Sequence, residues 1–365
     1  MTKDTIKSKV RHGVHVMFVS ALAGANIATL LLLWFTCLST HLDPAVHPRI
    51  SQAGLLFPVF LGIDLLFILI WAIVSCRWIL LPLMGIFFCW NYVKDYCPIN
   101  WSRDTVEKNV KVMSFNVAGF ANEPENGFEG WKTMEYVSRS GADVIFLQEC
   151  PSAGVIFNHL SQRMDSLGYH SRFLGGVRIY SKGPFVGETL HSDVSNLGNG
   201  SYACLANIGG DTVLLINNHL QSNAISQQEK ADYGNAIEQY DKEKMTTSGR
   251  LLLSRLTKAA KQRAEQTDKL CELIKKYEKY SMIVGGDLND TPISYTYQEV
   301  SKQLNNVFAE SGRGLGISFI RKGFPVRIDH LFVSRDFVVQ DTYIDDTICS
   351  SDHRPIITQV YKSAK

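Results

Sequence analysis

The segment Met282-Ile283-Val284-Gly285-Gly286-Asp287-Leu288-Asn289 is a short apolar, β-prone run that ends on polar side chains. Such a run predicts a buried strand that places a polar group at its end. Five further segments place polar residues at or beside strand-like runs, and they lie at residues 112–116, 143–149, 214–219, 327–334 and 351–355. Six such segments in one chain are difficult to explain by packing alone. The sequence therefore predicts strands whose ends share a polar site.

Two of these segments carry an acid next to a histidine, in Asp329-His330 and Asp352-His353. One such pair is common by chance, but two pairs beside strand-like runs indicate a hydrolytic site. An imidazole with a pKa of about 6.5 can take a proton from water at neutral pH, and a carboxylate is needed to orient its other nitrogen. Strand alternation is expected to turn His330 to the face opposite Asp329.

The order of the polar residues resembles the endonuclease/exonuclease/phosphatase superfamily, over residues 109–362. The matching positions are Asn116, Glu149, His219, Asp287, Asn289, Asp329, Asp352 and His353. The resemblance implies an α/β fold, a four-layer sandwich of two packed mixed β-sheets flanked by helices. It also implies hydrolysis of a phosphate ester with Mg²⁺, or with Mn²⁺ as the alternative. Members include DNase I-like nucleases, inositol polyphosphate phosphatases and neutral sphingomyelinases.

The resemblance assigns the metal ligands to Glu149, Asn116 and Asp352. Mg²⁺ prefers hard oxygen ligands and keeps several waters, so few carboxylates suffice. Glu149 follows an apolar run and forms the Gln-Glu dipeptide of the superfamily. Without the resemblance, Asn116 before Val-Ala-Gly would be interpreted as a turn former.

The catalytic roles implied by the resemblance fall on four residues. His353 is expected to be the general base, oriented by the distant Asp329 rather than by its sequence neighbour. Asp287 is expected to position the attacking water. His219 is expected to contact the scissile phosphate and to stabilise the developing charge or protonate the leaving oxygen.

Substrate binding is assigned to three residues. His219 has this role together with its catalytic one, Asn289 is expected to hydrogen-bond the phosphate, and Phe319 is expected to form a wall of the pocket. The alternative interpretations are an Asx-turn for Asn289 and an ordinary core position for Phe319.

The first hundred residues have the composition of a membrane region. The runs at 16–38 and 53–76 are each long enough to cross about 30 Å of hydrocarbon as a helix, and 78–93 is a shorter third run. We therefore expect a membrane region at 1–97 with about three transmembrane helices, a linker at 98–108 and a catalytic domain at 109–365. A cleavable signal peptide is disfavoured by the length of the first run and by the apolar runs that follow it.

Basic residues predict the orientation of this region. Lys3, Lys7, Lys9 and Arg11 place the N-terminus in the cytoplasm by the positive-inside rule. Three crossings then place the catalytic domain outside the cytoplasm. If residues 78–93 lie flat on the membrane or re-enter it, the domain would face the cytoplasm instead.

Composition leaves the substrate open. The net charge of +2 provides no basic field of the kind that nonspecific DNA-binding proteins use. The eight cysteines show no CxxC or CxxH spacing, so no zinc site is predicted. Residues 222–247 are expected to be an insertion beside the site, with a solvated loop as the alternative. A long amphipathic helix that includes residues 252–274 is expected to follow.

Three functions compete at this point. The first is a membrane-anchored, metal-dependent phosphoesterase that acts by in-line attack of water on a phosphodiester or phosphomonoester. Its substrate is a lipid headgroup, a nucleic acid or a small molecule. The second is a membrane-tethered binding module on a catalytically retired fold, which predicts losses among the matched positions, yet all are intact. The third is transport or sensing through Asp64, for which three short spans are too few. No protein partner is implied.

Overall fold

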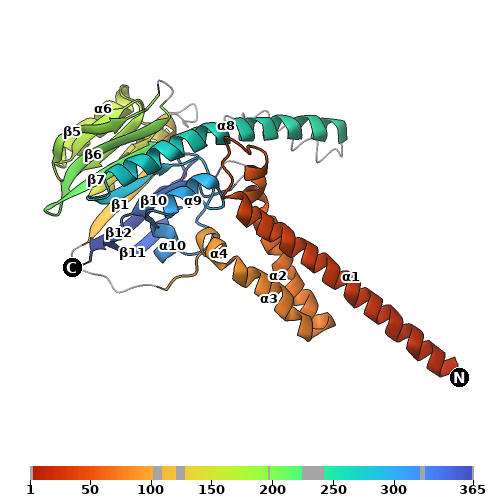
Figure 1. The fold of residues 1–365 in the computed structure, drawn as a ribbon. Helices are drawn as coiled ribbons and strands as arrows, with labels where there is room; N and C mark the ends of the chain where they lie inside the picture. The colour runs from red at the N-terminus through yellow and green to blue at the C-terminus, as the bar shows by residue number, and fades with distance from the viewer. Residues whose placement is uncertain are drawn as a thin grey trace.

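The structure, a computed structural model, describes residues 3–101, 109–120, 128–195, 198–223, 242–320 and 325–363. Figure 1 shows a layered body with the N-terminal helices projecting from one side of it. Most of the predicted linker, residues 102–108, and most of the predicted insertion, residues 224–241, lie outside the described residues.

Two six-stranded sheets form the layered body. In spatial order, the first contains β11 (Phe337–Ile344), β12 (Ile356–Lys362), β1 (Val110–Asn116), β2 (Val144–Gln148), β4 (Val177–Ser181) and β3 (His170–Leu174). The second contains β5 (Phe185–Ser192), β6 (Gly200–Ile208), β7 (Asp211–His219), β8 (Ser281–Asp287), β10 (Asp329–Val333) and β9 (Asn305–Asn306). The pairs β1–β2 and β7–β8 are parallel, whereas the neighbouring pairs are antiparallel. Both sheets are therefore mixed.

The two sheets pack face to face across an apolar core. Val112 and Phe146 enter it from the first sheet, Leu215 and Leu331 enter it from the second, and all four are fully buried. Burial of one such side chain contributes about 1.5–3 kcal/mol relative to exposure.

Helices cover the outer face of each sheet. The first sheet is covered by α5 (Phe128–Arg139) and α6 (Val155–Ser166), and the second by α8 (Lys242–Lys276) and α9 (Tyr295–Ser301). The short elements are η3 (Ala118–Phe120) and α10 (Val307–Ser311). This arrangement confirms the predicted four-layer sandwich, and α8 confirms the predicted long amphipathic helix.

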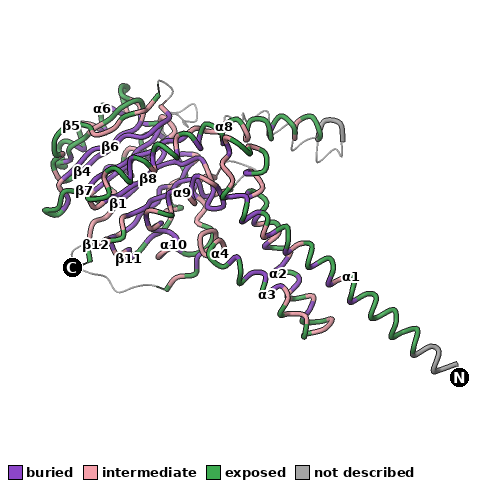
Figure 2. Tube along the Cα trace, viewed as in Figure 1, coloured by how far each residue is buried: buried purple, intermediate pink, exposed green. Residues whose placement is uncertain are grey.

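The N-terminal region is helical. It consists of α1 (Lys3–Ser39), η1 (Ile50–Leu56), α2 (Phe57–Val74), η2 (Cys76–Ile79), α3 (Leu80–Phe88) and α4 (Trp90–Tyr96). Two spans, one in α1 and one covering η1 and α2, are long and apolar enough to cross a membrane. The third predicted span is broken, because the segments on either side of Cys89 are bent by 69°. Large apolar side chains such as Met17, Leu31 and Ile73 are exposed on these helices. Much of α1 is coloured as exposed in Figure 2.

Asp64 is paired within the helix bundle. Its Oδ1 accepts hydrogen bonds from Asn26 Nδ2 at 3.0 Å and from Thr29 Oγ1 at 2.7 Å, so it joins α2 to α1. Trp71 Nε1 donates to Asn26 Oδ1 at 3.0 Å and extends this polar contact. A carboxyl group in an apolar helix is costly unless it is paired, and here the neighbouring helix supplies the partners.

Two features of the fold differ from the sequence interpretation. Strand β5 was not expected, because most of its residues are exposed and polar residues interrupt any apolar run. The start of the predicted linker packs on the layered body: Gly314 N donates to Pro98 O at 2.9 Å, and Asn100 Nδ2 donates to Gly312 O at 2.9 Å.

Candidate active site

Strand register brings the predicted catalytic residues of the second sheet together. In the parallel pair β7–β8, His219 lies opposite Asp287, and in the antiparallel pair β8–β10, Asp329 lies opposite Asp287. Asp287 is therefore the central residue of three adjacent strand ends. The ends of β1 and β2 carry Asn116 and, one residue after β2, Glu149.

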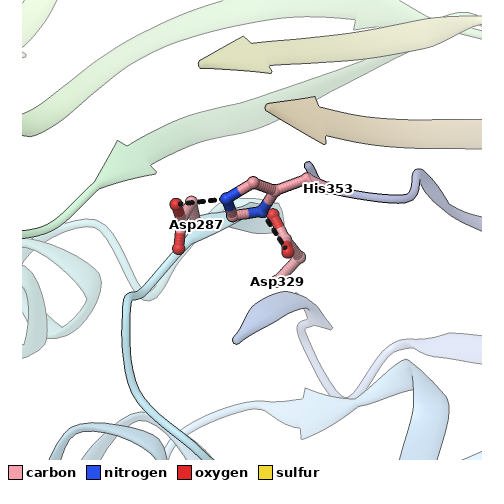
Figure 3. A group of neighbouring side chains, drawn as sticks. All are labelled: Asp287, Asp329 and His353. Atoms are coloured by element: carbon pink, nitrogen blue, oxygen red, sulfur yellow. Dashed lines mark hydrogen bonds and ion pairs between the residues drawn. The ribbon is translucent and has the colours of Figure 1, made fainter. Parts of the chain in front are cut away.

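His353 forms an acid-imidazole pair with Asp329 (Figure 3). Its Nδ1 lies 2.8 Å from Asp329 Oδ2, and its Nε2 lies 3.7 Å from Asp287 Oδ2. All three side chains are buried. The ring is thus oriented by Asp329 and directs its other nitrogen towards the site, which is the geometry expected of an oriented base.

A second group of polar contacts lies on the other side of Asp287. Asn116 Nδ2 donates to Glu149 Oε1 and to Asp287 Oδ2, each at 3.1 Å. His219 Nδ1 lies 3.1 Å from Gly198 O, and its Nε2 faces the carboxylates of Glu149 at 3.6 Å and Asp287 at 3.9 Å. Since the backbone carbonyl fixes the orientation of the ring, Nε2 is directed into the site.

The remaining predicted residues lie around this centre. Asn289 N donates to Asp287 Oδ1 at 2.8 Å, so the Asx-turn here is formed by Asp287 and not by Asn289. The Asn289 side chain instead donates from Nδ2 to Leu220 O at 3.0 Å. The ring of Phe319 lies 5.0 Å from the ring of His353, so Phe319 flanks this histidine. Asp352 is partly buried, and its backbone carbonyl accepts a hydrogen bond from Ile320 N at 2.9 Å.

The backbone is strained at two of these positions. Glu149 and Asn289 have φ values of 50° and 52°, in the left-handed region that non-glycine residues rarely adopt. Such conformations cost about 1–3 kcal/mol and concentrate at functional sites. Gly286 has φ 133°, and a Cβ there would lie 1.9 Å from Asn218 O, so only glycine allows β8 to approach β7 this closely.

The buried charges shift each other's protonation. Burial raises the pKa of Asp287 to about 6, although His353 and His219 oppose the shift. Burial disfavours a charged His353, but the carboxylates of Asp329 and Asp287 outweigh it and raise the pKa of the ring to about 10. The sequence interpretation assumed an imidazole with an ordinary pKa of about 6.5. The metal-free site instead holds His353 protonated at neutral pH, because two carboxylates flank it.

His330 has a different environment from His353. Burial, with the nearby charge of Arg327, lowers the pKa of His330 to about 3, so the ring is neutral. Its Nε2 lies 3.0 Å from the backbone carbonyl of Asp290. The ring is fully buried and contacts the loop after β8, on the face opposite Asp329, as strand alternation predicted.

The donor set fits a divalent cation with oxygen ligands. Carboxylate oxygens of Glu149 and Asp287 both lie 3.1 Å from one Asn116 nitrogen, and the Glu149 side chain is 46% exposed, so it is open to solvent. Ligand atoms of Asp287, Asp329 and His353 also lie within 4.8 Å of one another. In that second group, however, the hydrogen bond from His353 occupies Asp329 Oδ2. The carboxylates of Glu149 and Asp287 therefore fit the cation better. Asn116 directs its amide nitrogen at them, and its Oδ1 accepts a hydrogen bond from Ala118 N at 3.0 Å.

Several residues that support the site were not identified from the sequence. Gln148 Nε2 donates to Asn217 Oδ1 at 2.6 Å, and Asn217 Nδ2 donates to Leu147 O at 3.0 Å, so a buried amide pair joins the two sheets behind the site. Ser351 Oγ donates to Asn116 O at 2.8 Å and ties the Asp-His segment to β1. One sequence feature could have identified them: Gln148 and Asn217 are polar residues that precede predicted site residues in otherwise apolar strands.

Ser318 has a related supporting role. Its Oγ accepts hydrogen bonds from the backbone N–H groups of Ile328 and Asp329, each at 3.1 Å. Ser318 is fully buried and fixes the start of β10, where Asp329 begins the strand.

Family models match both parts of the chain. The Endonuclease/Exonuclease/phosphatase family matches residues 113–353, which is most of the chain and includes all eight predicted motif positions. The chain belongs to this family. It is therefore an enzyme of a class that acts on phosphoric ester bonds, as predicted. A domain of unknown function matches residues 18–96, the helical N-terminal region. No curated protein sequence matches the chain.

Solved structures of this family share the fold. An endonuclease/exonuclease/phosphatase from Beutenbergia cavernae is 16% identical, with a TM-score of 0.50 and coverage of 71% of this chain and 72% of that one. D. rerio TDP2 complexed with single strand DNA product is 16% identical, with a TM-score of 0.50 and coverage of 70% and 100%. The human Nocturnin catalytic domain with bound sulfate is 15% identical, with a TM-score of 0.50 and coverage of 73% and 97%. At these identities the likeness concerns the fold alone.

Proposed function

We propose that the chain is a membrane-anchored, divalent-metal-dependent phosphoesterase in which His353 is the general base. The observation that carries the proposal is the His353–Asp329 hydrogen bond of 2.8 Å beside Asp287, Glu149 and Asn116. An oriented imidazole, a central aspartate and a group of oxygen donors are what hydrolysis of a phosphate ester requires. The binding-module alternative is disfavoured, because each of these groups is present.

Each site residue has a role in this proposal. Glu149, Asn116 and Asp352 hold the cation, with Mg²⁺ as the expected ion and Mn²⁺ as the alternative. A bound divalent cation offsets the charge of the phosphate and favours deprotonation of water. Positive charge beside these carboxylates also lowers the pKa of the His353 ring, which links its action as a base to metal binding. Asp329 keeps Nδ1 of the ring oriented, so that Nε2 takes the proton of the attacking water.

The remaining residues act on the phosphate and the water. Asp287 positions the water from the centre of the three strand ends. His219 directs Nε2 towards the leaving oxygen, while Asn289 and Phe319 bound the substrate position. The left-handed backbone of Asn289 supports a constrained position close to Asp287.

The membrane region supports a substrate presented at a bilayer, such as a lipid headgroup. The loop after β8 contacts this region directly, since Ile293 packs in one apolar cluster with Leu33 and Phe57. A nucleic-acid substrate is the alternative, and the D. rerio TDP2 structure with single strand DNA product favours it. The near-neutral charge of the chain argues against nonspecific duplex binding.

A substrate panel tests the reaction. The full-length protein in detergent micelles is incubated with Mg²⁺ or EDTA and with sphingomyelin vesicles, phosphatidylinositol phosphate vesicles, single-stranded DNA, RNA and a chromogenic phosphodiester. The expected result is hydrolysis of at least one ester in Mg²⁺ and none in EDTA. Hydrolysis of no ester, or hydrolysis unaffected by EDTA, would contradict the proposal and favour a binding module.

We also propose that the catalytic domain lies outside the cytoplasm. The helix η1, between α1 and α2, contacts this domain, and so does α4, after α3. These contacts support a location of η1, α4 and the catalytic domain on the same side of the membrane. The side is then opposite the basic N-terminus, which requires the bent segment formed by α3 and α4 to cross the membrane rather than re-enter it. A C-terminal epitope tag should be cleaved by protease added to intact spheroplasts or cells. Cleavage only after permeabilisation would place the domain in the cytoplasm.

A further inference from the structure

The membrane region packs directly against the loop that follows catalytic strand β8. Gly54 of η1 approaches this loop so closely that a Cβ would lie 2.1 Å from the carbonyl oxygen of Ile293. The Ile293 side chain is buried in an apolar cluster that contains Leu33 of α1 and Phe57 of α2. The far end of the loop that begins at Asp287 is therefore seated in the membrane region.

Asp95, near the end of α4, makes a second contact with this loop through one amide group. Its carboxylate accepts a hydrogen bond from Tyr297 Oη at 3.2 Å and one from Gln298 Nε2 at 3.1 Å. The same Gln298 nitrogen donates to the carbonyl oxygen of Pro292 at 3.1 Å. The two N–H groups of Gln298 thus join Asp95 to the catalytic loop.

Arg327 makes the third contact and reaches the other catalytic segment. Its buried guanidinium donates to the backbone carbonyls of Asp95 and Tyr96. Arg327 precedes Asp329 by two residues, and Ile328 O, between them, accepts a hydrogen bond from Leu288 N at 3.0 Å. The segment that orients His353 and the loop that carries Asn289 are consequently held against the same helix end.

We infer that Asp95 is a positioning residue, through which the membrane region fixes the geometry of the catalytic loop around Asp287 and Asn289. The inference rests on the proposed function, because it assigns to the anchor a part in that reaction. Asp95 does not touch the reacting atoms. Its effect passes through Gln298 to Pro292, and a displacement of about 1 Å at a reacting group can cost about 10²-fold in rate.

The same interface offers a matched control. Lys94 Nζ lies 3.6 Å from Glu310 Oε1, and both side chains are more than a third exposed. This ion pair adjoins Asp95 in sequence and joins the same two regions, but Glu310 belongs to α10 rather than to the catalytic loop. An exposed pair of this kind contributes about 0–1 kcal/mol. Lys94→Ala therefore weakens docking without a direct effect on residues 288–294.

The experiment compares full-length variants in detergent micelles on a soluble chromogenic phosphodiester at saturating Mg²⁺. Asp95→Ala is expected to lower kcat about 10- to 100-fold, with KM within about threefold, whereas Lys94→Ala keeps the wild-type kcat. Asp95→Asn retains one acceptor oxygen and should be intermediate. Gln298→Met removes both donors from the catalytic-domain side of this contact and should lower kcat by the same factor as Asp95→Ala. This second variant provides the test should Asp95→Ala fail to fold.

Hydrogen exchange provides a readout that needs no activity. Backbone amides of residues 288–294 should exchange faster in Asp95→Ala than in Lys94→Ala, while the strand amides of β1 and β2 stay protected. A wild-type kcat in both Asp95→Ala and Gln298→Met, or equal losses in Asp95→Ala and Lys94→Ala, would overturn the inference. Unchanged exchange in residues 288–294 would do so as well. An inactive wild-type protein would instead count against the proposed function itself.

Discussion

His353 Nδ1 lies 2.8 Å from Asp329 Oδ2, although the two residues are 24 positions apart in the chain. The sequence neighbour of His353, Asp352, is not its hydrogen-bond partner in this contact. The pairing depends on the register of β10 against β8, which places Asp329 opposite Asp287. The Asp329 carboxylate thus orients the ring through Nδ1, and the Asp287 carboxylate faces Nε2, the nitrogen that is directed into the site.

Asp329→Asn tests the orienting role. The amide can occupy the same space, but it no longer stabilises the charge or fixes the tautomer of His353. We expect kcat to fall by about 10²- to 10⁴-fold, the range associated with general acid-base catalysis. The melting temperature should also fall, because the imidazolium loses the carboxylate that stabilises it, but the protein should remain folded. Steady-state kinetics with thermal denaturation measures both, and a kcat within threefold of wild type would exclude the role.

The pH dependence of stability follows from the raised pKa values of His353 and Asp287. In the metal-free protein, the contribution of His353 is fully present below pH 6.5 and is lost as the pH rises through about 10. That of Asp287 is present below pH 3.8 and is lost as the pH rises through about 6. Between pH 7 and 10 the Asp287 contribution is already lost and the His353 contribution is being lost, so the melting temperature in EDTA should fall over this interval.

The matched variant for this measurement is His353→Gln. Without the imidazolium, the fall in melting temperature between pH 7 and 10 should become shallower, because each unit of pKa shift corresponds to about 1.4 kcal/mol. Mg²⁺ should also reduce the pH dependence of the wild-type protein by offsetting the carboxylate charge. Parallel curves for wild type and His353→Gln would show that the ring does not titrate as described.

The Gln148–Asn217 pair should contribute to stability. Asn217→Ala leaves Gln148 and the carbonyl oxygens of Leu147 and Arg178 without this partner in a buried position. The expected loss is about 1–3 kcal/mol. Asn207→Ala is the control, since Asn207 caps an exposed turn through Gly210 N. Equal melting temperatures for the two variants would refute a special contribution of the inter-sheet pair.

Asp64 should stabilise the membrane helices. Asp64→Asn keeps an acceptor for Asn26 and Thr29, whereas Asp64→Ala leaves both without it. Interhelical hydrogen bonds in membranes contribute about 0.6 kcal/mol on average, so Asp64→Ala should lower the thermal stability in detergent modestly, and more than Asp64→Asn does. Loss of hydrolysis with unchanged stability would instead indicate a functional carboxylate.

The sequence predicted the fold and the site where local pattern carries the information. Apolar runs with polar residues at one end identified β1, β2, β7, β8 and β10. A buried strand must be apolar, and its end is where a polar side chain reaches solvent or a ligand. The superfamily motif then related these strand ends to one another. Strand β5 escaped prediction, since it forms by pairing with β6 at a sheet edge and not from an apolar run.

The long-range features could not be predicted in the same way. The pKa of His353 depends on Asp287, whose carboxylate lies 3.7 Å away because of tertiary packing. The contact between Asp95 and Gln298 joins residues 203 positions apart, and no pattern around either residue indicates the other. Both features require the relative placement of segments, which a single sequence does not specify.

The most direct test of the central claim is the metal-dependent turnover of His353→Ala in the full-length protein. The substrate is the ester that the wild-type protein hydrolyses in Mg²⁺. The account predicts that kcat falls by at least about 10²-fold, to a level that EDTA lowers no further, while the melting temperature shows a folded protein. Mg²⁺-dependent turnover close to that of the wild type would contradict the assignment of His353 as the base.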